Sequence, residues 1–402
     1  MDNGSKHSAL GKRHCMIVHA YYPIGEIRVE REARALIERG YEVDVICLRQ
    51  DGESAFSVED GVNVHRLPVA RHKGKGIAVQ FFEYLAFFVL AFFKVTALHF
   101  RRRYTVVQAH NLPDFLVFAG LIPKLMGARL ILDLHDLMPE FYASRFKSGM
   151  TALPIRLLFW QEKLSCLFAD HVITVTELWR QTLINRGVPA SKISVVMNVA
   201  NDRIFQRSNV TPVARNGHFN LIYHGQLSQR YGIDLAIRAV DLLRKEIPEI
   251  SFTIHGRGEY LNELKMLADT LGLNTHVRFS THYVPTRELP QLIGNAHAGI
   301  VPYRKDIFTD GILPTKMMEY AALGVPVIAA RTTAITAYFD SEMVQFFTPE
   351  DVDDLAQSIK LLFKDRDQLA QYARNIDKFN ERHNWKAVAA QYVEVVDRLN
   401  RK

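Results

Sequence analysis

The feature that most constrains the fold is an alternation of short apolar runs with longer amphipathic segments. In the first half of the chain, apolar runs lie at 15–22, 43–49, 62–68, 106–110, 130–135, 172–176 and 193–198, and helical patterns lie at 27–40, 77–100, 116–127, 154–168 and 177–187. Strands that alternate with helices are typical of a doubly wound parallel sheet. This half of the chain is therefore predicted to form an α/β domain.

A polar, turn-rich stretch at 199–218 interrupts the alternation, which then starts again. Further strands are expected at 219–225, 251–256, 277–280, 298–303, 325–330 and 344–348, with helices between them. We predict two Rossmann-like domains, at 1–205 and 206–402, with a last helix at about 384–400 that can pack back on the first domain. Sheets of this kind bind ligands at the carboxyl ends of their strands.

Composition narrows the class of protein. The chain has 402 residues, 48% hydrophobic and 23% charged, which is the balance of a globular protein with a full core. Its net charge of +7 comes mostly from the first half of the chain and suits an anionic partner. No nucleic-acid-binding motif accompanies that charge, so we expect no nucleic acid partner.

The cysteines and the N-terminal residues indicate in which cellular compartment the protein is found. The three cysteines lie in apolar runs without metal-ligand spacing, as expected for small buried side chains in a reducing compartment. The first 15 residues contain no apolar segment of the kind found in secretory signals. We therefore expect a cytoplasmic protein.

The segment at 77–104 adds a second expectation about location. It is apolar almost all round between Glu83 and Lys94, a span shorter than the ~20 residues that cross a bilayer. Three arginines follow at 101–103. Such a helix either covers a sheet or lies on an anionic membrane surface. The second alternative would make the protein peripheral on the inner face of the membrane.

The stretch from Gly311 to Ala330, GILPTKMMEYAALGVPVIAA, carries the clearest chemistry. Pro314 suits the first position of a helix, which puts Lys316 in the first turn, where the helix dipole disfavours a cation. An anion between Lys316 and the helix end would remove this conflict. Glu319 lies on the same helix face and could accept hydrogen bonds from ribose hydroxyls.

Two glycine-bearing turns are expected at the same edge of the second sheet. HGQLSQRYG (224–232) follows one strand and contains Gly225 and Arg230, and HGRGEY (255–260) follows the next and contains Gly256 and Gly258. Glycine turns and helix N-termini offer N–H groups to phosphates. The sequence therefore predicts a diphosphate site, although a tight turn with a solvated arginine is an alternative for 224–232.

PTKMMEYAALGVPVIAA resembles the P-x-K-x-x-E-Y-x-A-x-G-x-P-V-I-A signature of retaining glycosyltransferases of family 4. The stretches at 29–49 and 110–140 are also similar to that family, the latter to a subgroup that builds surface glycans and exopolysaccharides. The resemblance implies the GT-B fold, an α/β fold with two Rossmann-like doubly wound domains facing across a cleft. The acceptor would bind the N-terminal domain and a nucleotide-sugar the C-terminal one.

The resemblance also implies site residues. Catalytic roles fall on His110, Lys316 and Arg230. Binding of the donor falls on Gly225, Arg230, Gly256, Gly258, Asp310, Gly311, Lys316 and Glu319. Gly25 and Arg28 match the loop after the first strand, which closes on donor and acceptor. His135 and Asp136 would face the acceptor. Gly311 stands where the family often has a glutamate, and Asp310 beside it is a candidate replacement.

Structural alternatives remain for the residues of the first domain. His110 and His135 could be imidazoles satisfied at the start of a loop. Asp136 could cap a helix, and Arg28 could be a solvated helix arginine.

The implied reaction is transfer of a sugar to a hydroxyl with retention of the anomeric configuration. The resemblance also implies that the leaving diphosphate helps to take the acceptor proton. It implies no metal or cofactor, and the sequence contains no convincing set of metal ligands. A glycan or lipid-linked glycan is the expected acceptor. The alternatives are an inactive subunit that binds partners and, less favoured, a nucleotide-sugar epimerase.

Overall fold

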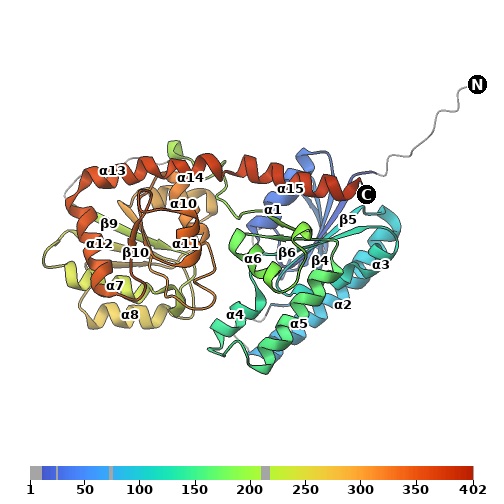
Figure 1. Ribbon diagram of the computed structural model, residues 1–402, viewed down its shortest axis with the longest axis horizontal. Coiled ribbons are helices and arrows are strands. Elements are labelled where there is room, and N and C mark those ends of the chain that lie inside the picture. The colour runs from blue at the N-terminus through green and yellow to red at the C-terminus, as the bar shows by residue number, and fades with distance from the viewer. Residues whose placement is uncertain (1–10, 24–25, 72–75, 210–217, 402) are drawn as a thin grey trace, which may run out of the picture. The chain divides into compact units, whose positions relative to one another are not determined.

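A computed structural model describes residues 11–23, 26–71, 76–209 and 218–401. The chain forms two compact units, each built on one parallel sheet flanked by helices (Figure 1). Unit 1 comprises the chain up to Met197 together with Val388–Lys402, and unit 2 comprises Asn198–Ala387. The division thus falls slightly before the expected boundary at 205, and the chain returns to unit 1 near its end.

The sheet of unit 1 has eight strands in the order β3-β4-β2-β1-β5-β6-β7-β8. Their bounds are β1 Arg13–Tyr21, β2 Glu42–Leu48, β3 Phe56–Glu59, β4 Val62–Leu67, β5 Val106–His110, β6 Arg129–Leu134, β7 His171–Thr174 and β8 Ile193–Val195. All neighbours are parallel except β3 and β4. The chain leaves β1 in one direction and returns to β5 on its other side, so the strand order reverses between them.

Strand β3 was not predicted. It forms a hairpin with β4 through Asp60 and Gly61, which both have positive φ angles (48° and 85°). Asp-Gly is a strong signal for a two-residue hairpin turn. An apolar run typical of a buried parallel strand is absent from β3, because the residues of this edge strand are exposed or partly exposed.

Helices cover both faces of this sheet. They are α1 Ile27–Glu38, α2 Ile77–Arg102, η1 Asp114–Gly120, α3 Leu121–Leu125, α4 Met138–Arg145, α5 Leu153–Phe168, α6 Glu177–Asn185, η2 Ala190–Lys192 and α15 Trp385–Asn400. The single helix expected at 116–127 is instead a 3₁₀ segment followed by a short α-helix, and α4 was not predicted.

Helix α2 is longer than the apolar segment suggested. Between Ala78 and Arg102 it is long and apolar enough to cross a membrane by length and composition, with 28% of its most apolar window buried. The expectation that this segment is too short to span was therefore wrong on length. The helix nevertheless packs on unit 1 through Phe87, Ala91 and Val95, which are all fully buried.

The sheet of unit 2 has six strands in the order β11-β10-β9-β12-β13-β14. They are β9 Phe219–His224, β10 Ile250–His255, β11 Val277–Ser280, β12 Ala298–Val301, β13 Val327–Ala330 and β14 Gln345–Phe347. The helical segments are η3 Arg207–Asn209, η4 Gln229–Tyr231, α7 Ile233–Leu243, α8 Leu261–Thr270, η5 Thr286–Glu288, α9 Leu289–Gly294, α10 Thr315–Leu323, α11 Thr333–Tyr338, α12 Val352–Lys364, α13 Arg366–Asn375 and α14 Asp377–Arg382. Strand order reverses between β9 and β12, which places a ligand-binding edge there.

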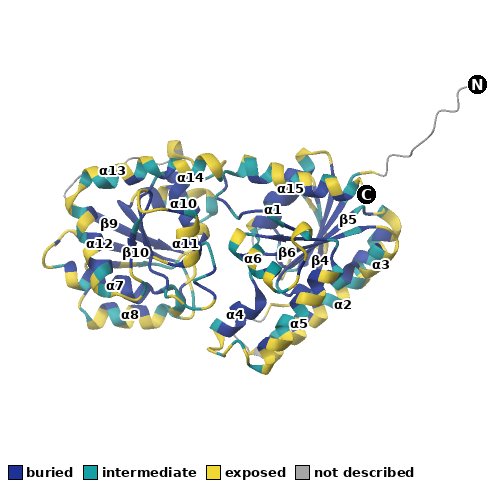
Figure 2. Ribbon diagram, in the orientation of Figure 1, coloured by how far each residue is buried: buried dark blue, intermediate teal, exposed yellow. Residues whose placement is uncertain are grey.

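The interior strands of both sheets are buried, as the colouring of Figure 2 shows. Helix α15 adds to the core of unit 1. Its Tyr392 is fully buried and donates a hydrogen bond to Oε1 of Gln108 in β5 (2.7 Å), and Asp397 accepts hydrogen bonds from Arg39 and Tyr41.

Candidate active site

The two glycine turns of unit 2 pack against each other at the carboxyl ends of β9 and β10. A Cβ atom on Gly256 would lie 1.8 Å from the carbonyl oxygen of Gly225, and one on Gly258 would lie 2.0 Å from that of Leu227. The amides of Gly225 and Gly256 already donate to His255 and Ser280 (2.9 Å each). These glycines therefore shape the turns by close backbone contact, and the amides of Gly225 and Gly256 are not free donors for a phosphate.

Lys316 lies at the same edge, but it is buried rather than exposed at a helix start. The helix begins at Thr315, one residue after Pro314, and Lys316 is 7% exposed. Its Nζ donates to the hydroxyl of Tyr303 (2.8 Å). The ammonium also faces three aromatic rings, with 4.9 Å to the centroid of Tyr223, 5.5 Å to Tyr231 and 5.0 Å to Tyr303.

The buried position of Lys316 changes its protonation. Burial lowers the pKa of Lys316 to about 8, although the nearby carboxylate of Glu319 partly opposes the shift. The tyrosine cage formed by the three rings compensates the ammonium through cation–π contacts and one hydrogen bond. A bound anion would stabilise the charged form further, so the site is suited to a negatively charged ligand.

Glu319 is held by a residue that the sequence did not suggest. Its Oε2 lies 2.5 Å from Nε2 of His224, and Nδ1 of His224 lies 2.9 Å from the hydroxyl of Tyr320. His224 is the last residue of β9, directly before Gly225. The only indication in the sequence that His224 could belong to the site was its position at the end of a predicted strand. The Glu319 side chain keeps 19% of its surface exposed, so it can still meet a ligand.

The other predicted donor residues lie around this core. Arg230 is half-buried in η4, with its guanidinium carbon 5.4 Å from the ring centroid of Phe308. Asp310 accepts hydrogen bonds from the backbone and hydroxyl of Thr333 (2.7 and 2.8 Å), which secures the start of α11. Gly311 follows it and is buried.

Arg304 is a second residue that the sequence did not suggest. Its guanidinium donates two hydrogen bonds to Asp234 in α7 (2.8 and 2.7 Å) and one to the carbonyl of Gln229 in η4 (2.6 Å). The backbone amide of Arg304 also donates to the carbonyl of Arg230 (3.1 Å), which ties the loop after β12 to η4. Arg304 therefore fixes the turn that carries Arg230.

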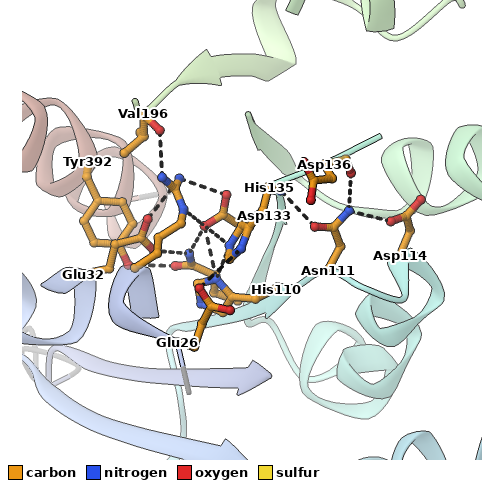
Figure 3. Close-up of polar contacts among 12 residues, drawn as sticks. Glu26, Glu32, His110, Asn111, Asp114, Asp133, His135, Asp136, Val196 and Tyr392 are labelled. Carbon is orange, nitrogen blue, oxygen red and sulfur yellow. Dashed lines mark hydrogen bonds and ion pairs between the residues drawn. The ribbon is translucent and has the colours of Figure 1, made fainter. Parts of the chain in front are cut away.

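In unit 1 a buried polar network lies at the carboxyl ends of β5 and β6 (Figure 3). Arg28 in α1 donates to both carboxylate oxygens of Asp133 (3.0 Å each), contacts Glu32 at 3.1 Å and donates to the carbonyl of Val196 (2.9 Å). Arg28 is therefore neither a solvated helix arginine nor part of the preceding loop. The predicted loop residue Gly25 lies outside the described residues.

His110 and His135 meet at Asp133. Nδ1 of His110 lies 3.1 Å from Oδ2 of Asp133 and 3.2 Å from Nε2 of His135, which is itself 3.5 Å from the same oxygen. Nε2 of His110 is buried without a hydrogen-bond partner among the described residues. Asp133 was not predicted, because a carboxylate inside the apolar strand LILDLH gives no local signal of its partners.

The two histidines differ in protonation. Burial lowers the pKa of His110, and the opposing effect of Asp133 is too small to restore it. Burial also disfavours the charged form of His135, but Asp133 outweighs it and the pKa of His135 is raised. Burial alone would raise the pKa of Asp133, yet Arg28 and the histidines hold it well below its usual range. The network therefore favours an ionised Asp133, a neutral His110 and a charged His135.

Among the described residues, His110, Asp133 and His135 form the one group whose ligand atoms lie close enough together to share a metal ion, all within 4.8 Å. The sequence did not suggest this group. Oδ2 of Asp133 already accepts from Nε of Arg28 (3.0 Å) and from Gln108 (3.3 Å). Because a guanidinium occupies that carboxylate, the arrangement is better suited to holding protons than a second cation.

Asn111 organises the loop after β6. Its side-chain amide donates to the carbonyl of Asp136 (2.6 Å) and to Asp114 (3.0 Å), and its oxygen accepts from the amide of His135 (2.8 Å). Asp136 is half-exposed beside His135 (Figure 3). It does not occupy the capping position of α4, which is Leu137.

Comparison with known proteins places this chain in a family. Residues 25–198 match a family described as a glycosyl transferase 4-like domain, and residues 209–379 match the glycosyl transferases group 1. The chain belongs to the family 4 glycosyltransferases. It is thus a glycosyltransferase of the type that uses nucleotide-sugars, with two domains of the GT-B fold.

Similar proteins include glycosyltransferases from bacteria and from humans. A GDP-mannose-dependent alpha-(1-6)-phosphatidylinositol monomannoside mannosyltransferase from Mycolicibacterium smegmatis is 33% identical over 35% of this chain and 37% of its own length. One subunit of the phosphatidylinositol N-acetylglucosaminyltransferase of Homo sapiens is 21% identical over 99% of this chain and 78% of its own. The putative colanic acid biosynthesis glycosyl transferase WcaI of Escherichia coli is 26% identical over 65% and 67%.

Solved structures agree on the fold. Sucrose-phosphate synthase from Thermosynechococcus elongatus has a TM-score of 0.77 at 18% identity, covering 96% of this chain and 99% of that one. HepE from Anabaena, solved with UDP, has a TM-score of 0.69 at 16% identity over 96% and 99%. At this identity the likeness concerns the fold.

Proposed function

We propose that this glycosyltransferase is an active enzyme that moves a hexose from a nucleotide-diphosphate sugar to an acceptor hydroxyl, with retention of the anomeric configuration. The observation that carries the proposal is the caged ammonium of Lys316 beside Glu319 at the strand-order reversal of unit 2. Parallel α/β sheets bind ligands at this place. A bound anion favours the charged form of a buried lysine, and a diphosphate is such an anion.

The residues then take distinct roles. Lys316 and Arg230 hold the diphosphate, and Glu319, fixed by His224, accepts hydrogen bonds from the ribose. In the transfer step the bond between the sugar and the diphosphate breaks, and the acceptor oxygen bonds to the same face of the sugar. The acceptor proton passes to the leaving diphosphate. The growing negative charge on that group is what Lys316 stabilises.

We propose that the step needs no metal or other cofactor, because protein cations supply this stabilisation. In unit 1 the proposed acceptor side comprises His135 and Asp136, and His110 is proposed to lie near the transferred sugar. The partial exposure of His135 (16% of its side chain) and of Asp136 supports the acceptor role, whereas His110 is fully buried.

The biological role we propose is assembly of a surface glycan or exopolysaccharide on a lipid-linked acceptor. Relatives named for colanic acid and amylovoran biosynthesis and for phosphatidylinositol glycans support this role. It would suit a cytoplasmic enzyme that is peripheral on the inner face of the membrane, attached through 77–104.

The experiment is incubation of the purified chain with a panel of nucleotide-sugars, with and without a chelator. A transferase releases nucleoside diphosphate, slowly to water and faster with an acceptor, and NMR of the product reports the anomeric configuration. Conversion of the sugar without release would indicate an epimerase, and no reaction with any donor an inactive binding subunit. Loss of activity with chelator, restored by a divalent ion, would contradict metal independence.

A further inference from the structure

Unit 1 exposes an unusual amount of apolar surface on one group of helices. Most of the large apolar side chains that are exposed on the described chain lie on α2, on α5 or on α3 and the residue after it. Phe82 and Phe93 of α2 are 66% and 65% exposed, and Leu125 of α3 is 74% exposed. Contiguous exposed apolar surface of this kind marks an interaction site.

Helix α5 shows the pattern most clearly. Its exposed apolar residues are Leu153, Leu157, Trp160, Leu164 and Leu167, which are 46–69% exposed. Their spacing of alternately four and three residues puts them on one face of the helix. The opposite face carries the buried Ile155 and Cys166. The helix is thus seated on unit 1 by one side and presents a leucine and tryptophan stripe outward, which we call the α5 stripe.

The exposed faces of α2, α3 and α5 belong to one surface. Both α2 and α5 pack on η1, and α2 also packs on α3. Phe115 of η1 contacts Phe88 of α2 (5.7 Å between ring centroids), and Phe118 contacts Phe168 of α5 (4.8 Å). Lys124 of α3 donates to the carbonyl of Phe168 (2.8 Å). Exposed residues of α2 and α5 lie along the same part of unit 1 (Figure 2).

The exposed charges carried by α2 and α5 have one sign. Each of α2 and α5 contains one carboxylate, and both are buried, where Glu83 contacts His19 (3.1 Å) and Glu162 contacts Arg186 (2.8 Å). The exposed charges of α5 are Arg156 and Lys163, and Arg101 lies at the exposed end of α2. Lys124 of α3 is paired with Asp170 (2.9 Å), so the unpaired exposed charges among these described residues belong to α2 and α5. Apolar side chains flanked by such cations fit an anionic lipid surface, whereas a second copy of the same surface would bring like charges together.

We propose that α2, α3 and α5 form a docking surface for an anionic bilayer, with the α5 stripe as its main apolar contact. The helices lie along the membrane plane, because the buried side of each stays packed on unit 1. The stripe enters the headgroup region, where Trp160 sits well with its indole N–H near water. This extends the membrane contact beyond the helix at 77–104, and it does not depend on which sugar is transferred.

The test compares matched variants in sedimentation with vesicles of phosphatidylcholine alone or with added phosphatidylglycerol. Leu157→Ser/Trp160→Ser removes two members of the stripe, and Leu242→Ser/Met266→Ser removes two apolar residues of unit 2 that are 50% and 61% exposed. We expect wild type and the unit 2 variant to bind the anionic vesicles equally. The stripe variant should bind roughly ten- to a hundredfold more weakly.

A charge variant separates the electrostatic contribution of the exposed cations from the apolar contribution of the α5 stripe. Arg156→Gln/Lys163→Gln should weaken binding to anionic vesicles roughly five- to thirtyfold, because each surface cation contributes about one kilocalorie per mole near an anionic membrane. It should leave binding to phosphatidylcholine unchanged. Melting curves and nucleotide titration on all variants should match wild type, which keeps a failure of docking distinct from a failure of the donor site.

Two results would overturn the proposal. One is wild-type protein that does not bind anionic vesicles or binds them as well after loss of the α5 stripe. The other is a stable dimer in solution that Leu157→Ser/Trp160→Ser converts to monomers, because the stripe would then be covered by a second copy.

Discussion

At the scale of single residues, the protonation of Lys316 affects both the stability of unit 2 and the binding of an anion at the proposed donor site. Its folded-state pKa of about 8 lies below the usual value of 10.5, so folding disfavours its charge. The penalty is fully present below pH 8 and disappears as the pH rises toward 10.5, because the unfolded chain then also loses the proton. The ammonium of Lys316 therefore destabilises the free protein, but it is available to pair with an anionic ligand.

Replacing Lys316 should therefore stabilise the free protein. Lys316→Met keeps the aliphatic volume and removes the buried charge. We expect a gain on the order of 1–3 kcal/mol at pH 7, reduced by the lost contacts to the tyrosine cage and vanishing near pH 10.5. Denaturant unfolding at both pH values measures it. Equal or lower stability of Lys316→Met at pH 7 would mean that the cage fully compensates the ammonium.

The same protonation should appear in ligand binding. The affinity for a nucleoside diphosphate should be constant below pH 8 and fall as the pH rises through the pKa of Lys316, because the ammonium loses its charge. Isothermal titration calorimetry from pH 7 to pH 9.5 measures this. Lys316→Met is the matched control and should bind weakly without that pH dependence. A pH profile shared by both proteins would assign the titration to another group.

Glu319 gives a prediction of a different kind. Glu319→Gln keeps the shape but replaces a carboxylate oxygen with an amide donor, which weakens its bonds to ribose hydroxyls. Loss of a hydrogen bond to a charged group costs about 1.5–3 kcal/mol, or roughly 10- to 150-fold in affinity for nucleoside diphosphate. Glu263→Gln, an exposed residue of α8, is the control. Unchanged calorimetric affinity in Glu319→Gln would leave the ribose assignment wrong.

At the scale of elements, the sequence predicted what local patterns determine. Parallel strands such as β5 and β12 were found because an apolar run bounded by turn residues is a local signal. The signature around Lys316 and Glu319 indicated a donor site for the same reason. Helix α5 shows the limit. Its periodicity identifies a helix, but it does not tell which face packs on unit 1, so the exposed stripe could not be predicted.

Residues that act through long-range contacts were missed. His224, Tyr303 and Asp133 come from separate strands or the loops after them, and each meets its partner at least 13 residues away in sequence. Nothing in the local sequence around Asp133 indicates that its partner is Arg28, which lies 105 residues earlier in the chain. A buried network of this kind becomes visible only when the sheet order is known.

The glycine turns of unit 2 give a prediction at this scale. Gly258→Ala should destabilise unit 2 by at least about 1–3 kcal/mol, because its Cβ would lie 2.0 Å from a carbonyl oxygen in the adjoining turn. Gly272→Ala is the control, since Gly272 has a positive φ of 66° but a Cβ atom there would meet only the side chain of Arg244, at an ordinary contact distance of 3.7 Å. Its cost should be limited to about 1 kcal/mol of backbone strain. Thermal unfolding measures both, and a similar loss in the two would show that the turns can separate without cost.

At the scale of the whole molecule, the chain returns to unit 1 through α15, and this return completes the core of that unit. Tyr392 donates to Oε1 of Gln108, whose amide donates to Glu32 (2.8 Å) and to Asp133 (3.3 Å). The end of the chain therefore supports the network that holds His110 and His135. Unit 2 contains a close counterpart, in which Tyr372 donates to Oε1 of Gln345 (3.1 Å).

These two tyrosines allow a matched test of how the chain end contributes to function. Tyr392→Phe and Tyr372→Phe each remove one hydroxyl that donates to a glutamine, at a cost of about 1 kcal/mol in stability. Only Tyr392→Phe removes a partner of Gln108, whose Oε1 then keeps, among the described residues, only its contact with Nε2 of His14 (3.1 Å). This loosens the support of Asp133, so we expect turnover to fall while affinity for nucleoside diphosphate stays at the wild-type value. Tyr372→Phe should change neither. Steady-state kinetics with nucleotide calorimetry on both variants measures this, and equal turnover in the two would show that the network of unit 1 stabilises the fold without positioning the acceptor side.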